Sequence, residues 1–224
     1  MPAIKDPLDR KSLIRKPRLS NQIYELLRSE LRSGKYAADT RFTEPAIAED
    51  LQTSRTPVRE ALFQLVNNGL LCEFDRGYGL PKLSAVDVQH MMEIRISLET
   101  MAIEKLCESV NEEQLKMLNK AVANEQKSVS KKDPADFIIA NNTFRELLYE
   151  LTGNPHLAET AELYSDRLQI FRVLTLRESE NRKFVSGEHK KLVAAIADKN
   201  KKLAVSIHIE MLEGATKAYV NAAV

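Results

Sequence analysis

Cysteine, long apolar runs and a secretion signal are scarce or missing in this chain of 224 residues. The only cysteines, Cys72 and Cys107, stand in no short metal-binding spacing. They are expected to be reduced, buried thiols rather than a disulfide framework. No run approaches the roughly 20 apolar residues of a membrane span, and the first residues lack the apolar core of a signal peptide. These absences predict a cytoplasmic protein.

Motifs of the common enzyme classes are also missing. The sequence has no GxSxG nucleophile elbow, no HExxH zinc motif and no glycine-rich phosphate loop. We therefore do not expect an enzyme. An all-α enzyme with a DNA-binding appendage stays a distant alternative, which turnover of a bound ligand would identify.

The chain has almost no net charge, but its basic and acidic residues are unevenly distributed along the sequence. The net charge is +1, whereas residues 1–82 hold 14 basic against 11 acidic side chains and the remainder is slightly acidic. A basic N-terminal part is suited to phosphate contact. Residues 1–18 are polar and basic and predict a flexible tail, with a disordered DNA-binding arm as the alternative.

The most informative stretch is residues 54–62, SRTPVREAL. Arg55 and Arg59 lie four residues apart near a helix start, which places both guanidinium groups on one face, and Ser54 is suited to cap that helix. Residues 43–51 predict a short preceding helix capped by Thr43, and Gln52-Thr53 predict a tight turn. Together they predict a helix-turn-helix, whose second helix enters the DNA major groove.

Two arginines alone are more often solvated surface charges, but the sequence that follows favours DNA binding. The helix continues with an apolar stripe, at Ala61, Leu62, Leu65 and Val66, and stops at Asn67-Asn68-Gly69. Residues 70–83 then predict a hairpin with Arg76 at its tip. A hairpin after a helix-turn-helix makes a winged helix.

The rest of the chain, residues 84–224, predicts helices with short connections. Six segments have helical periodicity: 85–110, 111–131, 133–153, 154–179, 181–198 and 200–221. Short connections between long helices indicate antiparallel neighbours. The predicted fold class is mainly α: a winged helix-turn-helix over 19–83, then an antiparallel bundle of about six helices over 84–224.

Four polar side chains occupy positions of the bundle where the periodicity expects apolar ones: Asn141, Arg145, His189 and His208. Each alone is more often a satisfied core residue or an arginine reaching to the edge. Because polar groups facing a core need partners, four of them indicate a polar cavity.

The N-terminal part resembles the DNA-binding domain of the GntR family of bacterial transcription regulators, in its FadR-type branch. The match runs from about Ser20 to Leu83 and centres on SRTPVREAL. The resemblance implies DNA contacts from the recognition helix and the wing, by Ser54, Arg55, Thr56, Arg59, Arg76 and Gly77. Some relatives carry an arginine before the turn, where this chain has Glu44-Pro45-Ala46, so the resemblance does not imply a DNA contact from these residues.

The bundle resembles the FCD effector domain of the same branch, through EIRISLETMA, TFRELLYELTGNPHL and GEHKKLVAAIADKNKKLAVSIH. The resemblance implies an effector pocket, a homodimer and often a divalent metal. The family's metal pattern is an Asp, a His four residues later and two later His. This chain keeps His189 and His208 but has Asn141 and Arg145 in the first two places.

The two replacements predict that the metal site is lost and that no cofactor binds, because a guanidinium has no lone pair to offer a cation. Arginine holds carboxylates and phosphates instead. We expect an anionic effector bound by Asn141, Arg145, His189 and His208, with Arg95 also lining the pocket or forming a helix salt bridge with Glu99. The alternative is a metal-dependent sensor using His189, His208, Asn141 and an unrecognised carboxylate.

These expectations describe a homodimeric, ligand-responsive regulator. It is expected to repress transcription from a twofold-symmetric operator until a small organic-acid-like effector binds. No membrane partner is expected.

Overall fold

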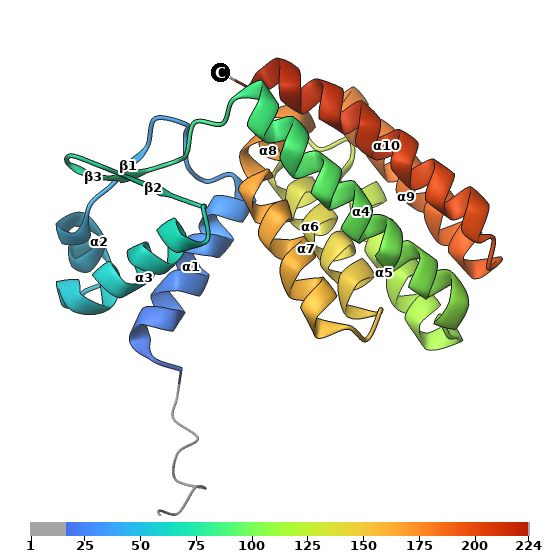
Figure 1. Cartoon of the computed structure of the whole chain (residues 1–224), viewed down its shortest axis with the longest axis horizontal. Coiled ribbons are helices and arrows are strands. Elements are labelled where there is room, and N and C mark those ends of the chain that lie inside the picture. Colours follow the sequence, from blue (N-terminus) through green and yellow to red (C-terminus); the bar gives the residue numbers. More distant parts are fainter. Residues whose placement is uncertain (1–16, 224) are drawn as a thin grey trace, which may run out of the picture.

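The computed structural model describes residues 17–223 and has two parts joined by one short connection. Three helices and a small sheet form the N-terminal part, and a bundle of antiparallel helices forms the rest (Figure 1). This architecture confirms the predicted fold class. The tail expected over residues 1–18 lies almost wholly outside the described residues.

The helix-turn-helix forms where the sequence predicts it. Helix α2 (Glu44–Asp50) begins after Thr43, whose side chain accepts a hydrogen bond from the Ala46 amide at 3.4 Å. Helix α3 (Arg55–Asn67) follows after a turn in which Gln52 has a φ of 49°. Both helices pack with α1 (Leu19–Ser33) around an apolar core of their own.

The wing contains one strand more than predicted. Strands β2 (Cys72–Phe74) and β3 (Gly77–Gly79) form the expected hairpin, and β1 (Arg41–Phe42) pairs with the other side of β3. The order β1-β3-β2 makes β3 the central strand. A two-residue strand carries too little sequence pattern to be recognised, and Phe42 anchors it by inserting into the core around α3.

The bundle contains seven helices among the described residues. Their bounds are α4 (Ala85–Ser109), α5 (Glu112–Ser128), α6 (Ala135–Glu150), α7 (Pro155–Arg167), α8 (Gln169–Leu176), α9 (Ser179–Ala197) and α10 (Lys201–Ala222). Polar caps fix several of the starts. Ser84 and Asn111 form capping boxes, and Asn154 and Asn200 each accept an amide hydrogen bond.

The fourth predicted segment, 154–179, is divided into α7 and α8 at Leu168. The backbone at Leu168 has φ −93° and ψ 3°, and its side chain is fully buried. The sequence has no glycine or proline there, so local signals did not predict the division. It allows the two short helices to present side chains in different directions.

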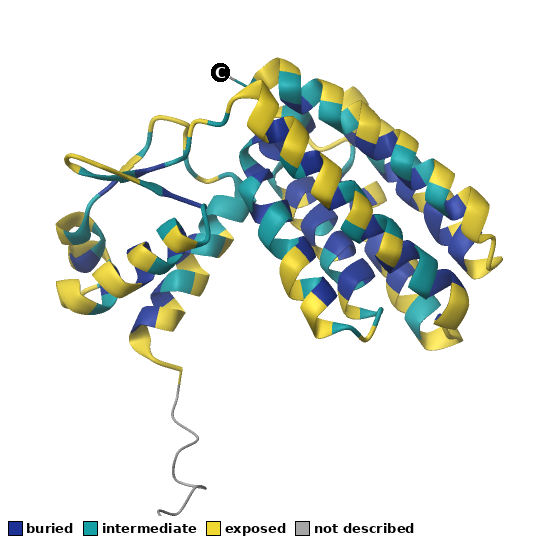
Figure 2. Ribbon diagram, in the orientation of Figure 1, coloured by how far each residue is buried: buried dark blue, intermediate teal, exposed yellow. Residues whose placement is uncertain are grey.

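The apolar faces of the helices point inward, as Figure 2 shows by the buried stripes along α4, α6 and α9. Helix α10 lies along α4 and α9, and α5 lies along α6. Cys107 is buried in this core, whereas Cys72 in the wing is only half-buried, and both are free thiols. In the described part of the chain no helix has the length and apolar character needed to cross a membrane.

Candidate functional site

The start of α3 presents an exposed polar surface. Ser54, Arg55, Thr56 and Arg59 are all exposed there. Ser54 occupies the N-cap position, as predicted. Its side chain makes no hydrogen bond to the helix amides, so the prediction that Ser54 caps α3 through its side chain is wrong. Because Ser54 does not satisfy the first amides of α3, the helix end keeps its free N–H groups and its preference for anions.

Arg59 on α3 forms an ion pair with Glu44, the first residue of α2. Its Nε and Nη2 atoms donate to the two carboxylate oxygens of Glu44 at 2.7 and 2.8 Å. Arg55 has no ion pair among the described residues. Arg55 is therefore free to meet a DNA base or phosphate, whereas Arg59 must either exchange partners or act from a fixed position.

The wing places Arg76 at its exposed tip, in the two-residue turn between β2 and β3. Gly77 follows with a φ of +92°, a conformation that favours glycine. The guanidinium carbon of Arg41 lies 3.8 Å from the ring centroid of Phe74, which holds β1 to the hairpin. The wing thus places Arg76 at the exposed tip of a small sheet whose strands are held together by the contact of Arg41 with Phe74.

The bundle encloses a cavity of about 190 Å³ between α4, α6, α8, α9 and α10. The five residues predicted for the effector pocket all line it, and so does a sixth polar residue that the sequence analysis missed. These residues are Arg95, Asn141, Arg145, Arg172, His189 and His208. All six are buried.

Glu99 is the carboxylate at the centre of the strongest charge cluster. It accepts hydrogen bonds from Arg95 at 2.8 Å, from Arg145 at 2.5 Å and from His208 at 2.8 Å, and Tyr149 also donates to it. Burial alone would raise the pKa of Glu99, but the surrounding cations hold it well below its usual range. Arg95 and Glu99 thus form the helix salt bridge, while Arg95 also lines the cavity.

A second carboxylate supports the other histidine. Both oxygens of Glu125 lie 3.0 Å from Nδ1 of His189, and Asn141 donates to the same carboxylate at 3.2 Å. The ring of Phe144 stacks on His189 with centroids 4.1 Å apart. Both histidine rings are therefore fixed in orientation by carboxylates.

Arg172 differs from the other two cavity arginines because it has no carboxylate partner among the described residues. Its guanidinium donates only to neutral oxygens, of Asn142 at 3.0 Å, Gln169 at 2.5 Å and Ser165 at 3.1 Å. Burial lowers the pKa of Arg172 to about 9, and the positive charges of Arg145 and Arg95 contribute to the shift. The cavity therefore contains a positive charge that the protein does not neutralise.

Two polar atoms of the lining residues lack a hydrogen-bond partner among the described residues, Nε of Arg145 and Nδ1 of His208. Burial lowers the pKa of His208, so its imidazole is neutral near pH 7. Because its Nε2 contacts the Glu99 carboxylate, Nε2 carries the proton and Nδ1 is left as an acceptor. The cavity thus offers one unsatisfied donor and one unsatisfied acceptor.

The residues present do not fit a divalent cation. No three His, Cys, Asp or Glu residues converge on a metal-binding geometry in residues 17–223. The guanidinium of Arg145 stands among the potential ligands, Glu99 is occupied by two arginines, and Glu125 by His189 and Asn141. A cation would meet positive charge where it needs lone pairs.

Comparisons with known proteins agree with the two-part architecture. Residues 19–77 match the gntR family of bacterial regulatory proteins, and residues 90–214 match the FCD domain. The HTH-type transcriptional regulator YdhC of Bacillus subtilis is 30% identical over 185 residues, which cover 82% of this chain and 83% of that protein.

The chain belongs to the GntR family of bacterial regulatory proteins. With its FCD domain it is a transcription regulator that fits the FadR-type branch. The gluconate operon repressor of Bacillus subtilis is 25% identical over 191 residues, covering 83% of this chain and 78% of that protein. The fold matches E. coli McbR with a TM-score of 0.82 at 24% identity, over 92% of this chain and 99% of that one.

Membership of this family confirms the expectation that the chain is a regulator and not an enzyme. Regulators of the GntR type bind DNA and typically act as dimers. Arg95, Asn141, Arg145, His189 and His208 line the cavity as predicted from the sequence, whereas Arg172 was not predicted. The sequence does contain a sign of this buried arginine, because Arg172 lies inside the apolar run QIFRVL. The expectation of one continuous helix over residues 154–179 did not place this run on a separate helix facing the cavity.

Proposed function

We propose that this GntR-family regulator represses transcription and leaves its operator when a small organic anion binds in the bundle cavity. In this proposal residues 19–83 bind DNA, and residues 84–224 bind the effector and form the homodimer. The contacts to DNA come from Ser54, Arg55, Thr56 and Arg59 on α3 and from Arg76 and Gly77 in the wing. The exposure of the four α3 residues at one end of the helix, and of Arg76 at the tip of the hairpin, supports this assignment, while Gly77 beside Arg76 is half-buried.

The observation that carries the effector assignment is the charge inside the cavity. Of the three buried guanidinium groups that line the cavity, Arg95 and Arg145 share one carboxylate, Glu99, whereas Arg172 has no acidic partner among the described residues. An isolated buried charge is costly unless it is paired. A carboxylate or phosphate would neutralise Arg172 and accept its hydrogen bonds. The free acceptor at Nδ1 of His208 favours an anion that also carries a hydroxyl group.

The names of two relatives agree with this assignment. One relative is named as repressor of a gluconate operon, and gluconate is a hydroxy carboxylate. Another, RspR of E. coli, is also named as a repressor and is 27% identical over 134 residues. For the present chain we infer the same direction of regulation and a hydroxy acid as the effector class.

The effector assignment predicts a specific pattern of thermal stabilisation. Purified protein is screened against hydroxy acids, other carboxylates and phosphates, with and without chelator. A true ligand at about 100 times its Kd should add roughly 2.7 kcal/mol to the free energy of unfolding. Arg172→Met should abolish that shift, and the wild-type affinity should fall above about pH 9 as Arg172 loses its proton.

Arg182→Met is the matched control for this experiment. Arg182 is also a buried arginine, but it donates to main-chain oxygens of Val129, Leu176, Arg177 and Lys131 and does not line the cavity. The control should lower the melting temperature yet keep the ligand-induced shift. A shift that persists in Arg172→Met, or one that disappears with chelator, would contradict the proposal.

The DNA assignment predicts different effects for the two arginines of α3. Arg55→Ala should weaken operator binding by about 1–3 kcal/mol and relax sequence preference if Arg55 reads a base. Glu44→Gln should change the operator preference, because Glu44 holds Arg59 in a two-point contact. Binding to a randomised DNA pool, sequenced before and after selection, measures both effects. Equal preference in wild type and Glu44→Gln would contradict a role of the Glu44–Arg59 contact in readout.

A further inference from the structure

The segment Ser165–Arg172, which spans the division between α7 and α8, faces two parts of the molecule. Its first and last residues take part in the cavity network, where Ser165 accepts from Arg145 at 2.6 Å and from Arg172 at 3.1 Å. Three residues between them contact the winged-helix part instead: Asp166, Arg167 and Gln169. One short segment therefore connects the cavity to the DNA-binding half.

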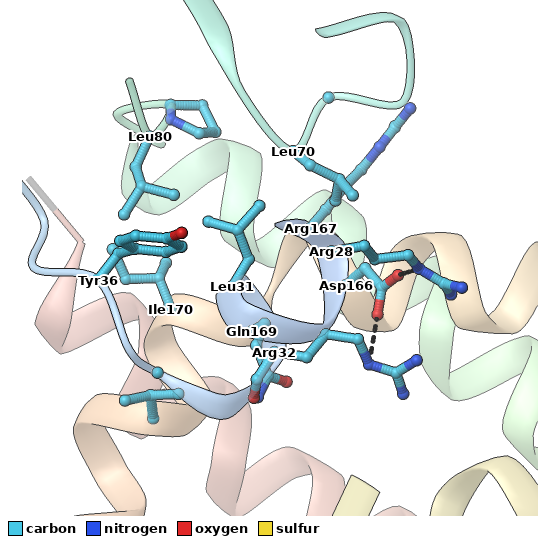
Figure 3. A pocket seen from close by; sticks show the side chains of 14 residues that line it. Arg28, Leu31, Arg32, Tyr36, Leu70, Leu80, Asp166, Arg167, Gln169 and Ile170 are labelled. Carbon is cyan, nitrogen blue, oxygen red and sulfur yellow. Dashed lines mark hydrogen bonds and ion pairs between the residues drawn. The ribbon is translucent and has the colours of Figure 1, made fainter. Parts of the chain in front are cut away.

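The side chains of this segment that point away from the cavity contact both α1 and the end of α3. The Asp166 carboxylate lies 2.6 Å from Nε of Arg28 and 3.2 Å from Nε of Arg32, and Figure 3 shows it between the two arginines of α1. Arg167 donates to the main-chain oxygen of Asn68 at 2.8 Å, and Asn68 is the C-cap of the recognition helix α3. This segment thus contacts both α1 and the end of the recognition helix.

Two buried side-chain amides connect Arg172 to the end of α1. Nη1 of Arg172 donates to Oδ1 of Asn142 at 3.0 Å and to Oε1 of Gln169 at 2.5 Å. The other ends of these amides, Nδ2 of Asn142 and Nε2 of Gln169, both donate to the main-chain oxygen of Arg32, the former at 3.1 Å. Arg32 is in the last turn of α1, and Figure 3 shows Gln169 next to it.

The direction of both amides is determined by their neighbours. A guanidinium only donates and a main-chain oxygen only accepts. Rotating either amide by 180° would bring donor against donor at Arg172 and acceptor against acceptor at Arg32. Each amide can therefore bridge Arg172 and the main-chain oxygen of Arg32 in only one orientation. Both hydrogens of Nη1 of Arg172 are used in the hydrogen bonds to the two amide oxygens.

We propose that Asn142 and Gln169 form an amide relay that transmits the state of Arg172 to the C-terminal end of α1. The inference rests on the proposed function, since it gives the route by which an anion in the cavity alters the DNA-binding half. An anion that accepts hydrogen bonds from Nη1 must displace at least one amide oxygen. The released amide loosens its hold on Arg32, and α1 and the packed α3 change position relative to the bundle.

The relay is tested first without any ligand, by hydrogen–deuterium exchange of the full chain. Arg172→Met removes the guanidinium and should speed exchange of the amides at and just after the end of α1, residues 33–36, by roughly 5–10-fold, as expected for a lost hydrogen bond. Asn142→Asp keeps an acceptor for Arg172 but removes the donor to Arg32. It should speed exchange at the same amides while leaving the melting temperature of the bundle unchanged or raised.

Arg182→Met is the matched control, because Arg182 is a buried arginine that donates to neither amide and forms no hydrogen bond with the segment Ser165–Arg172. It should leave exchange at residues 33–36 at the wild-type rate. Equal acceleration in Arg182→Met and Arg172→Met, or wild-type exchange in Asn142→Asp, would overturn the relay.

The second arm adds an anion and separates the relay from the proposed function. Citrate is used as the probe because it is a hydroxy acid with several carboxylates. In wild type, citrate should speed exchange at residues 33–36, and in the double variant Asn142→Asp/Gln169→Glu this response should be lost. If citrate stabilises the wild type but leaves those amides unchanged, the relay is wrong and the proposed function stands. If neither citrate nor any screened anion binds, the proposed function fails, while the ligand-free variants still decide the relay.

Discussion

Glu99→Gln is expected to lower the free energy of unfolding by about 3–5 kcal/mol, the range for removing one partner of a buried ion pair. Two guanidinium groups, the Tyr149 hydroxyl and the His208 ring all donate to this carboxylate. Glutamine preserves the volume of the side chain but removes the charge, which leaves Arg95 and Arg145 buried without their counter-ion. Equilibrium unfolding in urea measures the loss.

The same carboxylate predicts a sensitivity to acid. Because the pKa of Glu99 is lower in the folded state than in the unfolded chain, the unfolded chain binds its proton first as the pH falls. The stability that Glu99 contributes is fully present above its unfolded pKa of about 4.3 and is lost as the pH drops below that value. Between roughly pH 5 and pH 3 the wild type should therefore lose stability more steeply than Glu99→Gln.

Glu108→Gln is the control on the same helix. Glu108 is exposed and pairs with Lys201 at 3.1 Å near the surface. Exposed pairs of this kind contribute about 0–1 kcal/mol. If the two variants lose similar stability, Glu99 is not the counter-ion of the cavity arginines.

Gly77→Ala is expected to lower stability by about 2–5 kcal/mol and to abolish operator binding through the wing. The φ of +92° disfavours any residue with a side chain, and a β-carbon there would collide with the main-chain oxygen of Phe42. Relief of the collision requires separation of β1 from β3, which removes the support of Arg76. Urea unfolding and operator titration measure the two effects.

Gly153→Ala separates backbone strain from the collision. Gly153 also has a positive φ, +67°, but a β-carbon there would meet no atom within 4 Å. The expected loss is only about 1–2 kcal/mol, with operator binding unchanged. An effect of Gly77→Ala no larger than this would mean that the wing accommodates the added carbon.

The sequence by itself determined the elements whose signals are local. The cap at Thr43, together with apolar stripes at helical spacing, predicted α2, α3 and most bundle helices, because capping and periodicity are properties of neighbouring residues. Periodicity also identified Asn141, Arg145, His189 and His208 as buried, since a helix fixes which positions share a face. The motif SRTPVREAL identified the DNA-binding half.

Only the tertiary structure decided how these elements act on one another. The division at Leu168, the pairing of β1 with β3, and the contact of Glu44 with Arg59 join residues that no local pattern relates. The charge balance of the cavity likewise depends on five helices at once, so the sequence alone did not predict that Arg172 has no acidic partner among the described residues. Its connection to Arg32 spans 140 residues, and only the packing of α1 against the bundle brings the two together.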